Sequence, residues 1–530
     1  MKTFFLRHKG ICGLYFVFMM LNATIAVIMA ELLSEITAFA LHGGDDFPIL
    51  IGKIVAFCLY ITFIYVTYDF IKMKYRSSIM IDLEQDAYRS IMKQELYPFH
   101  LKNPSEYSSF FLNDLKIVEE NYLKQVPDLL SGAIQMIVNA IYVFQLNGWI
   151  LVMFVVSSLI MLWIPKLASP AIQKKTEQFS QAANRFTTFL KETFSGFDTI
   201  ATNHARNAYI QHTKRSFQTY QTSKQKMELA VDLSNTASNV FSLTFQLVLI
   251  IGTGFLIVKG ELSADYLFSI VSISGTFLGN VFTVTQAMTS IQSSKPMRKK
   301  WQQIRALPSF QSEDAPVVDT LRLDNVTYEI QNRRIINRMD FCFERGKHYL
   351  IIGESGSGKS TLFHLLSGKL KPQRGRIVTG NSDEYESSCI TTISQTPVSF
   401  EDTVQHNMTL YRTGLDEEVA SVLPQVHLDE GMLEKIVGED HATISGGELQ
   451  RISIARSLMD PRSFLLCDES TANLDPQTCR IIEDTLANLK ETSVLFITHH
   501  VTDHTIESFD VILKLEQGRL HDVTQQYKED

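Results

Sequence analysis

Long apolar runs without any charged residue dominate the first 300 positions of the chain. A membrane-spanning helix needs about 20 mostly apolar residues, so runs of this length predict spanning helices and not a soluble core. Four of the runs contain no Asp, Glu, Lys or Arg: 10–30, 129–165, 233–258 and 266–294. A fifth run, 54–68, gains 47–52 across Lys53, whose long side chain can reach the membrane surface.

The run 129–165 is long enough for two helices, and Asn147-Gly148 near its centre is typical of a turn. We therefore predict an all-α membrane domain over 1–305. Its six spans are expected at about 10–38, 48–72, 127–146, 149–166, 234–258 and 264–292. The alternative for the N-terminal run is a cleaved signal peptide, but the run is longer than a typical hydrophobic signal segment.

The two connectors 73–126 and 167–233 are charged, contain little Gly or Pro, and place apolar residues at helical spacing. Examples are Ile79, Leu83 and Ala87. We expect membrane helices that continue far into the cytoplasm, because 25 helical residues reach roughly 35–40 Å.

Basic residues cluster before span one and after spans two, four and six, whereas the other loops carry almost none. This asymmetry predicts that both chain ends are cytoplasmic and that the protein is a multi-pass protein of the cell membrane. Only about ten residues precede span one, so we expect no leader peptidase domain in this chain.

The charge balance divides the chain in two. Residues 1–300 have a net charge of +6 and residues 301–530 a net charge of −14, which gives −8 for all 530 residues. The positive net charge of residues 1–300 follows from basic residues at span ends. Neither half resembles a nucleic-acid-binding protein. The six cysteines are scattered without C-x-x-C spacing, so we expect free thiols and neither a disulfide framework nor a zinc site.

A phosphate-binding loop opens the second half, after a polar, proline-containing linker at 306–316. The apolar strand 349–352 runs into Gly-Glu-Ser-Gly-Ser-Gly-Lys-Ser-Thr and then into a helical segment. The pattern G-x4-G-K-S between a strand and a helix is typical of loops whose backbone N–H groups surround phosphates. We expect nucleotide contacts from Gly353, Glu354, Ser355, Gly356, Ser357, Gly358, Lys359, Ser360 and Thr361. Lys359 supplies a positive charge for the phosphates and Ser360 a hydroxyl for Mg²⁺.

An acidic strand end follows 109 residues after Lys359. The apolar run 464–467 predicts a buried parallel strand, and Asp468 and Glu469 then lie at the same sheet edge as the phosphate loop. Asp468 is expected to hold Mg²⁺ directly or through water, and Glu469 to polarise an attacking water.

A third motif, Ile-Ser-Gly-Gly-Glu-Leu-Gln-Arg at 444–451, lies just before this strand. A Ser-Gly-Gly that opens a helix between a phosphate loop and an acidic strand end resembles the signature of ABC ATPases. The resemblance covers the whole chain: Gln395 matches the Q-loop, 470–475 resembles the D-loop, 437–439 the exporter X-loop, and His499 the switch histidine.

Six spans fused before one such ATPase resemble an exporter-type half-transporter. The resemblance implies an α/β ATPase domain over 317–530 with a helical signature subdomain, ATP and Mg²⁺ as cofactors, and a dimer, either homo- or heteromeric. In such a dimer Ser445, Gly446, Gly447 and Glu448 of one chain would face the partner's nucleotide. The resemblance also implies Glu469 as catalytic base, His499 on the γ-phosphate and Gln395 at Mg²⁺.

Several positions depart from the family pattern. Ile330 stands where the family stacks an aromatic ring on adenine, and Tyr328, two residues earlier, is expected to pack in a strand. Glu448 replaces the more common Gln, His441 a frequent Gly, and His500 a frequent Arg. These departures leave every expected catalytic residue in place.

The resemblance is nearest in style to bacterial peptide or bacteriocin exporters, so the predicted function is ATP-driven export, with a peptide as cargo. A multidrug or lipid exporter is the first alternative. A non-transporting, ATP-gated regulatory protein is the second, which the presence of Glu469 and Ser445 disfavours. Glu31 and Glu35, one helical turn apart, are candidate substrate contacts within span one, alongside an outer-interface role.

Overall fold

The computed structural model describes residues 7–43, 47–307, 316–380, 385–438, 444–471, 474–498 and 501–528. The chain divides into two compact units. The membrane unit comprises 1–90 and 105–306, and the ATPase unit comprises 91–104 and 307–530. The second unit thus includes a short segment from within the first half of the sequence.

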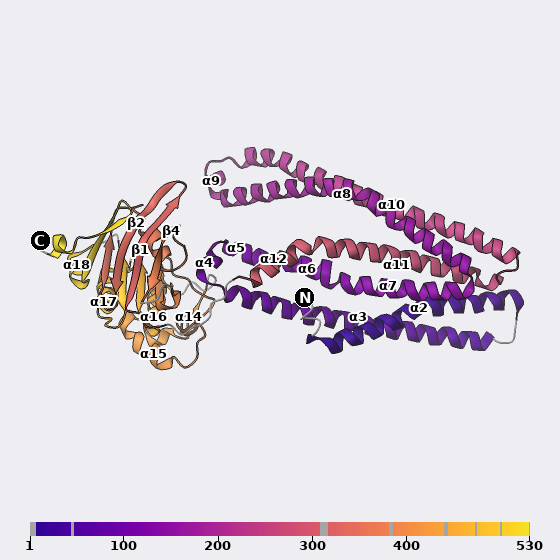
Figure 1. Ribbon diagram of the computed structural model, residues 1–530, viewed down its shortest axis with the longest axis horizontal. Helices are drawn as coiled ribbons and strands as arrows, with labels where there is room; N and C mark the ends of the chain where they lie inside the picture. Colours follow the sequence, from indigo (N-terminus) through magenta and orange to yellow (C-terminus); the bar gives the residue numbers. More distant parts are fainter. Residues whose placement is uncertain are drawn as a thin grey trace. The chain divides into compact units, whose positions relative to one another are not determined.

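Within the described residues, six helices are long and apolar enough to cross a membrane, as predicted. Their cores are α2 (Lys9–His42), α3 (Phe47–Met92), α7 (Gln125–Leu146), α8 (Gly148–Ser195), α10 (Arg206–Val258) and α11 (Leu267–Ser293) (Figure 1). The predicted turn between the third and fourth helices is confirmed. The Asn147 side chain accepts a hydrogen bond from the Trp149 backbone N–H at 2.8 Å and so caps the start of α8.

Shorter elements connect the long helices. After α3 come α4 (Leu96–His100), α5 (Pro104–Ser109), the π-helix η1 (Phe110–Asp114), α6 (Leu115–Val118) and the π-helix η2 (Glu119–Leu123). The 3₁₀ turn η3 (Ala264–Tyr266) precedes α11, and α12 (Lys295–Arg305) follows it.

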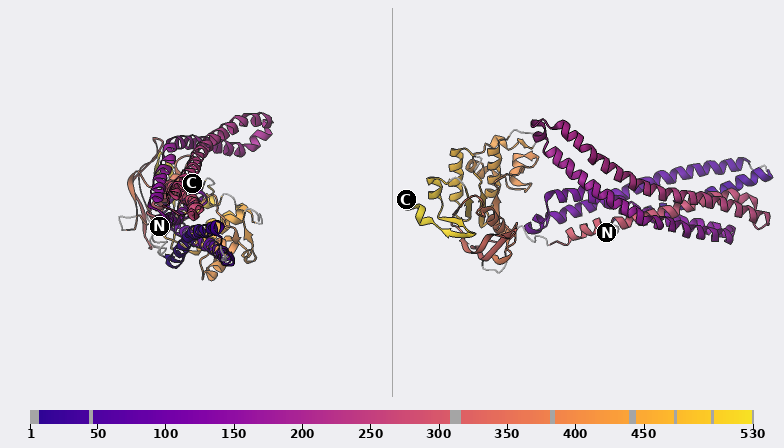
Figure 2. Two further views of the ribbon diagram at one scale, coloured as in Figure 1. Left: turned by 90° about the vertical axis from the view of Figure 1, so that its right-hand side faces the viewer. Right: turned by 90° about the horizontal axis from the view of Figure 1, so that it is seen from above.

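α8 and α10 extend well beyond the length of a span, at 48 and 53 residues. They lie side by side along their length and are joined by α9 (Phe197–Thr202), as Figures 1 and 2 show. Aromatic rings hold the extensions together: Phe186 stacks on Tyr220 with ring centroids 4.8 Å apart. The predicted long helical extensions are therefore present.

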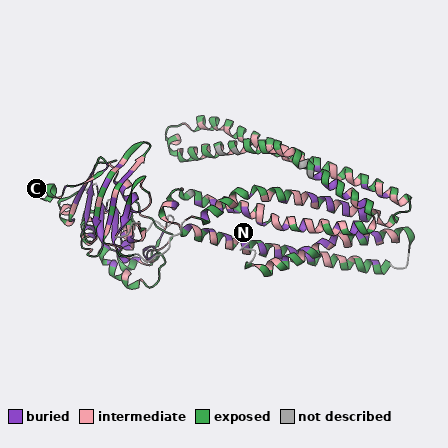
Figure 3. Ribbon diagram, viewed as in Figure 1, coloured by how far each residue is buried: buried purple, intermediate pink, exposed green. Residues whose placement is uncertain are grey.

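The membrane unit has a packed interior and an apolar exterior. Phe154 of α8 and Phe277 of α11 are both buried and form an edge-to-face pair with centroids 5.0 Å apart. In contrast, Leu59 on α3 is 69% exposed and Val258 on α10 is 88% exposed. Figure 3 shows exposed residues along the long helices of this unit. Exposed side chains of this kind suit contact with lipid tails.

Ion pairs join helices at the end of the bundle where α7 begins. Lys72 Nζ lies 2.9 Å from an Asp128 carboxylate oxygen, Arg76 Nε lies 3.1 Å from Glu119, and Lys300 Nζ lies 2.5 Å from Asp114. These basic residues are the ones expected at span ends, and part of their charge is neutralised within the unit.

A six-stranded sheet forms the centre of the ATPase unit, in the order β11-β10-β3-β9-β8-β5. Its strands are β3 (Tyr349–Ile352), β5 (Ile390–Ile393), β8 (Phe464–Asp468), β9 (Ser493–Ile497), β10 (Val511–Glu516) and β11 (Arg519–Asp522). All neighbours are parallel except the β10–β11 pair. The strands Tyr349–Ile352 and Ser493–Ile497 are buried throughout, which explains their mostly apolar sequence.

A second, antiparallel sheet of three strands has the order β2-β1-β4, with β1 (Thr320–Ile330), β2 (Arg333–Glu344) and β4 (Arg374–Thr379). A two-stranded pair joins β6 (Asp402–Thr403) to β7 (Ile436–Val437). The remaining described segments include α13 (Lys359–Leu366), α14 (Val404–Thr409), α15 (Asp416–Val422), α16 (Gly446–Met459), α17 (Pro476–Ala487), α18 (Asp503–Ser508) and α19 (Thr524–Lys528). Single-turn 3₁₀ helices complete the unit: η4 (Ser387–Cys389), η5 (Pro424–Val426) and η6 (Glu430–Met432).

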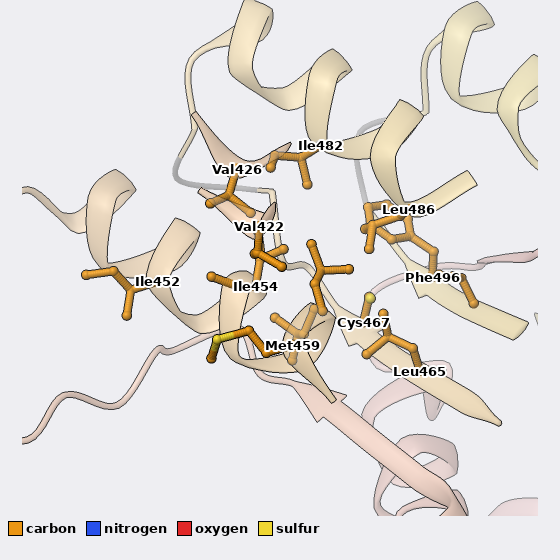
Figure 4. Packing of buried hydrophobic residues seen from close by; sticks show 14 of the residues in the cluster. Val422, Val426, Ile452, Ile454, Met459, Leu465, Cys467, Ile482, Leu486 and Phe496 are labelled. Carbon is orange, nitrogen blue, oxygen red and sulfur yellow. The ribbon is translucent and has the colours of Figure 1, made fainter. Parts of the chain in front are cut away.

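One hydrophobic core joins the helices at 404–459 to the six-stranded sheet (Figure 4). Ile454 on α16 packs in the same cluster as Val422 of α15, Leu465 and Cys467 of β8, and Phe496 of β9. Because this cluster is continuous, the orientation of α16 is fixed relative to the strands that carry the phosphate loop and the acidic strand end.

Residues 401–450 contain 11 acidic and 2 basic residues, and several of these carboxylates lie at helix starts. Asp416, Glu417 and Glu418 lie in the first turn of α15, and Asp429 caps η6 by accepting a hydrogen bond from the Gly431 N–H at 2.8 Å. Glu448 lies in the first turn of α16. Carboxylates favour helix starts because the exposed N–H groups there carry partial positive charge.

Candidate ATP-binding site

The phosphate loop lies between β3 and α13, as predicted, and its glycines are required by its geometry. Gly358 has φ +104°, and a Cβ atom there would come within 2.8 Å of Ile335 Cγ2. A Cβ on Gly353 would come within 2.8 Å of the Leu515 carbonyl oxygen. The loop therefore closes tightly against β2 and β10, with Glu354, Ser355 and Gly356 exposed at its tip.

Lys359, the first residue of α13, folds back over the loop. Its Nζ donates hydrogen bonds to the carbonyl oxygens of Gly353 at 2.7 Å and Glu354 at 3.1 Å, and its side chain is only 6% exposed. Burial lowers the pKa of Lys359, while the negative charges of Glu469 and Asp468 act in the opposite direction. The acidic strand end is therefore close enough to the lysine for the charges to interact.

The acidic strand end also meets the predicted Q-loop residue. Glu469 follows β8 with φ +49°, and its backbone N–H donates to the Ile497 carbonyl oxygen at 2.9 Å. Its carboxylate Oε2 accepts a hydrogen bond from Gln395 Nε2 at 2.7 Å. A non-glycine residue in the left-handed region is strained, and such strain is common at functional sites.

The remaining loop residues fit a bound phosphate with its metal ion. The Ser357 hydroxyl is buried with no hydrogen-bond partner among the described residues, so a phosphate oxygen would satisfy it. Ser360 is exposed at the start of α13, Thr361 is half-buried, and Asp468 is half-buried at the end of β8. A hydroxyl and a carboxylate are ligands that Mg²⁺ accepts.

The signature residues form the start of α16. The Ser445 side chain accepts a hydrogen bond from the Glu448 N–H at 3.2 Å, and the Glu448 carboxylate accepts one from the Ser445 N–H at 2.7 Å. This reciprocal pair is a capping box, and the hydrogen bond from the Ser445 backbone is the main cause of a lowered pKa for Glu448. Ser445 and Gly446 are exposed and Gly447 is half-buried, so the helix start is open to a ligand.

Some predicted motif residues lie outside the described residues: His499, His500, His441, Glu439, Ala472, Asn473 and linker residues 308–315. Asp475, the last residue of the D-loop, is the N-cap of α17, and its side chain accepts hydrogen bonds from the Gln477 and Thr478 backbone N–H groups. Val437, the first residue of the X-loop, pairs with Asp402 of β6.

The position expected to contact adenine is an exposed aliphatic residue. Ile330 at the end of β1 is 46% exposed, whereas Tyr328 is half-buried and packs against the core beneath the antiparallel sheet. The prediction that Tyr328 packs as a strand residue is confirmed. Any contact of a nucleobase with Ile330 would lack aromatic stacking.

Sequence reasoning did not find the segment 91–104. It belongs to the ATPase unit, where α4 lies against the loop after α13. Lys371 Nζ lies 5.0 Å from the centre of the Tyr97 ring, within range of a cation–π interaction, and Pro98 is buried. The sequence analysis treated 73–126 as one helical connector, and local spacing gave no signal for this contact.

Comparison with known proteins identifies the family. The model of the ABC transporter transmembrane region matches residues 12–281, and the ABC transporter ATP-binding model matches residues 336–472. The chain belongs to the ABC transporter family. It has the six-span, single-ATPase architecture of an exporter-type half-transporter and is an integral, multi-pass membrane protein.

The relatives of this ABC transporter are named for different cargos. It is 30% identical to a mycobactin import ATP-binding/permease protein of Mycolicibacterium smegmatis, over 53% of this chain and 52% of that protein. It is 23% identical to the mesentericin-Y105 transport/processing protein of Leuconostoc mesenteroides, over 95% of this chain and 73% of that protein. The alignments span about half of the mycobactin protein and 61% of a mitochondrial iron–sulfur clusters transporter from Chaetomium globosum.

A solved structure shares the fold. A bacterial Atm1-family ABC exporter with ATP bound superimposes with a TM-score of 0.82 and 19% sequence identity, over 97% of this chain and 94% of that chain. At this identity the likeness establishes the fold alone.

Proposed function

We propose that this chain is one half of a dimeric, ATP-driven exporter. The observation that supports this most directly is the contact of Gln395 Nε2 with the Glu469 carboxylate at 2.7 Å, beside a buried Lys359, in a chain that also has six spanning helices. One sheet edge thus gathers a phosphate-binding lysine, a carboxylate and a glutamine, which are the groups that nucleotide hydrolysis requires.

In this proposal the loop 353–361 surrounds the phosphates of ATP. Ser360, Gln395 and Asp468 would hold Mg²⁺, which would neutralise phosphate charge. Lys359 exchanges its backbone partners Gly353 and Glu354 for phosphate oxygens when nucleotide binds, because an ammonium group prefers an anionic acceptor to a neutral carbonyl.

Glu469 is the proposed base, which accepts a proton from the water that attacks the γ-phosphate. The hydrogen bond from Gln395 orients its carboxylate, and the strained backbone at Glu469 directs the side chain toward Gln395. His499, which follows β9 in the sequence, is proposed to contact the γ-phosphate.

A second copy, or a related half-transporter, is proposed to complete each site. The exposed start of α16, with Ser445, Gly446, Gly447 and Glu448, is an anion-binding surface that would face the partner's ATP. ATP would thereby hold two ATPase domains together, and hydrolysis would release them.

The proposed location is the cell membrane with both termini in the cytoplasm, supported by the basic residues at the end of the bundle where α7 begins. The proposed cargo is a peptide, supported by the relative named for mesentericin transport. A lipid is the second candidate, because an ATP-dependent lipid A-core flippase of Idiomarina loihiensis is 26% identical over 81% of this chain and 78% of that protein. Stimulation of ATP hydrolysis by a neutral peptide, compared with lipid A, separates the two cargos.

The deciding test is Glu469→Gln in the full chain in lipid nanodiscs. The amide keeps an oxygen for the hydrogen bond from Gln395 but cannot accept the proton, so ATP turnover should fall at least about 100-fold while ATP binding persists. Glu434→Gln, an exposed carboxylate of the same unit, is the matched control and should leave turnover unchanged. Normal turnover in the Glu469→Gln variant would show that another group accepts the proton.

A further inference from the structure

The outer face of the antiparallel sheet in the ATPase unit contains a hollow of about 740 Å³. Strands β1, β2 and β4, which lie side by side in Figure 1, contribute to it together with β11. We call this hollow the arginine pocket, because its basic members are four arginines and one histidine, all exposed: Arg334, Arg338, Arg374, Arg519 and His521.

Breaks in the strand pairing shape the pocket. The pairing of β1 with both β2 and β4 shifts register around Thr327. Close to these shifts, Asn325 and Arg338 have φ values of +49° and +46°, which are uncommon for residues with a side chain. The Arg338 backbone N–H donates to the Thr327 hydroxyl at 3.2 Å. Such bulges bend a strand and redirect its side chains, and they are frequent next to functional sites.

The acidic side chains of the pocket are already engaged. They are Glu329 and Asp340 among the described residues that line it. A Glu329 carboxylate oxygen lies 2.9 Å from Arg334 Nε, and Asp340 accepts a hydrogen bond from the Asn325 backbone N–H at 2.7 Å. One of the four arginines is therefore neutralised within the sheet.

The other three arginines keep their positive charge without a counter-ion. Arg338, Arg374 and Arg519 form no ion pair within the part of the chain that the structure describes. Arg519 Nε donates only to a neutral acceptor, the Asn337 carbonyl oxygen, at 3.3 Å. Like charges gathered in one hollow repel each other, so an anion bound between them would be stabilised by all three.

The pocket is separate from the phosphate loop. β2 presents Met339 to a hydrophobic core that also contains Leu362 of α13, the helix that follows the loop. Arg338 and Asp340, the neighbours of Met339, are exposed on the opposite face of the sheet, since successive residues of a strand point to opposite sides. ATP held by the phosphate loop would therefore leave the pocket empty.

We propose that the arginine pocket binds a phosphate-bearing anion with two or more negative charges, as a second anion site of the ATPase unit. Guanidinium groups stay charged at neutral pH, and their paired N–H donors match two oxygens of one phosphate. A neighbouring hollow of about 440 Å³ shares Arg374 with the pocket and adds the side chains of Gln331 and Asn332. A longer ligand has room to extend there. Soluble polyphosphates and phospholipid headgroups share this chemistry.

Binding of inorganic tripolyphosphate tests the site. The full chain carrying Lys359→Ala is placed in phosphatidylcholine nanodiscs, so that the phosphate loop contributes little, and is titrated by calorimetry without nucleotide. Adding Arg338→Gln/Arg374→Gln should weaken binding at least about tenfold, because it removes two charged hydrogen-bond donors. Lys435→Gln/Arg480→Gln, which removes two exposed basic residues of the same unit outside the pocket, is the matched control and should leave binding unchanged.

The melting temperature without ligand should be the same in all these variants, since the exchanged side chains are exposed. If the double variant does not fold, Arg374→Gln alone should weaken binding several-fold. Equal binding in the pocket variant and the control variant would overturn the inference.

Phosphatidylglycerol vesicles identify the source of the phosphate. Binding of tripolyphosphate supports a soluble ligand, whereas binding of the vesicles alone supports a lipid headgroup, provided that the pocket variant weakens it. Binding of neither probe would overturn the inference. So would tighter binding of a glutamate-rich peptide than of either probe, because the pocket would then be a docking site for an acidic protein segment.

Discussion

The two units of this transporter bury apolar side chains in opposite ways. Strands β3 and β9 of the ATPase unit are buried on both faces, whereas Leu59 on α3 and Val258 on α10 of the membrane unit are mostly exposed. Apolar side chains buried inside the unit are typical of a domain surrounded by water, and apolar side chains on the outside are typical of a domain surrounded by lipid. Consequently, a polar exposed residue is ordinary on the ATPase unit but informative on the membrane unit.

The units also differ in how function is encoded. In the ATPase unit, contiguous motifs place their residues at one sheet edge, because parallel strands all end there. In the membrane unit, contacts such as the Lys72–Asp128 and Lys300–Asp114 ion pairs join residues far apart in the sequence, and they form only when the helices pack. The difference predicts that single substitutions in the ATPase motifs have larger effects than single substitutions on helix faces.

The largest expected effect is that of Lys359→Ala. The variant removes the charge that neutralises the phosphates, so ATP hydrolysis and ATP-dependent transport should both fall by a factor of 100 or more, roughly. ATP hydrolysis is measured at steady state in nanodiscs, and transport is measured as uptake into inverted vesicles. Lys435→Ala, an exposed lysine of the same unit, should behave as wild type. Transport that survives Lys359→Ala would show that ATP does not drive it.

The next largest effect is expected from an alanine substitution at a tightly packed glycine, compared with the same substitution at a glycine with free space around it. A Cβ on Gly375 in β4 would lie 2.2 Å from the Asn325 carbonyl oxygen, and the residue has φ +77°. Gly375→Ala should therefore destabilise the ATPase unit by about 3 kcal/mol, measured by scanning calorimetry of the full chain. Gly254→Ala on α10, where a Cβ would meet nothing within 4 Å, should change stability by less than about 0.5 kcal/mol. Equal stability changes in the two variants would show that the close contact at Gly375 does not matter for stability.

A smaller effect is expected at Tyr97, in the segment of the first half that packs with the ATPase unit. Tyr97→Ala removes the cation–π contact with Lys371 and should weaken the docking of α4 by about 1 kcal/mol. We expect basal ATP hydrolysis to persist and its stimulation by cargo to fall several-fold. Tyr97→Phe keeps the ring and should restore stimulation. If cargo stimulates ATP hydrolysis equally in both variants and in wild type, α4 has no role in this stimulation.

The smallest effect concerns the cap of α16. Because the pKa of Glu448 is lowered in the folded chain, its ionised form stabilises the fold above its ordinary pKa, and this contribution disappears as the pH falls through the lowered value. Glu448→Gln should cost less than about 1 kcal/mol near neutral pH, with the difference from wild type vanishing under acid conditions. Stability measured from pH 7 to pH 3 checks the sign, and a difference that grows on acidification would contradict it.

Much of the fold follows from local sequence. Spans end where charge or a turn such as Asn147-Gly148 interrupts an apolar run, and the phosphate loop forms where Gly353 and Gly358 permit it. The free cysteines and the strand packing of Tyr328 also agree with the sequence analysis. Of the two glutamates in span one, Glu35 forms an ion pair with Lys53 at 2.5 Å, a contact across helices that spacing along the chain does not reveal.

The sequence by itself determined the elements and the motif chemistry, because spans, strand–loop–helix turns and helix caps depend on neighbouring residues. Only the tertiary structure decided which distant groups meet. It brought Gln395 to Glu469 across 74 positions, assigned 91–104 to the ATPase unit, and left the buried Asn139 Oδ1 without a hydrogen-bond partner among the described residues. The physical reason is that burial, exposure and hydrogen-bond satisfaction are properties of packed surfaces, which local spacing does not specify.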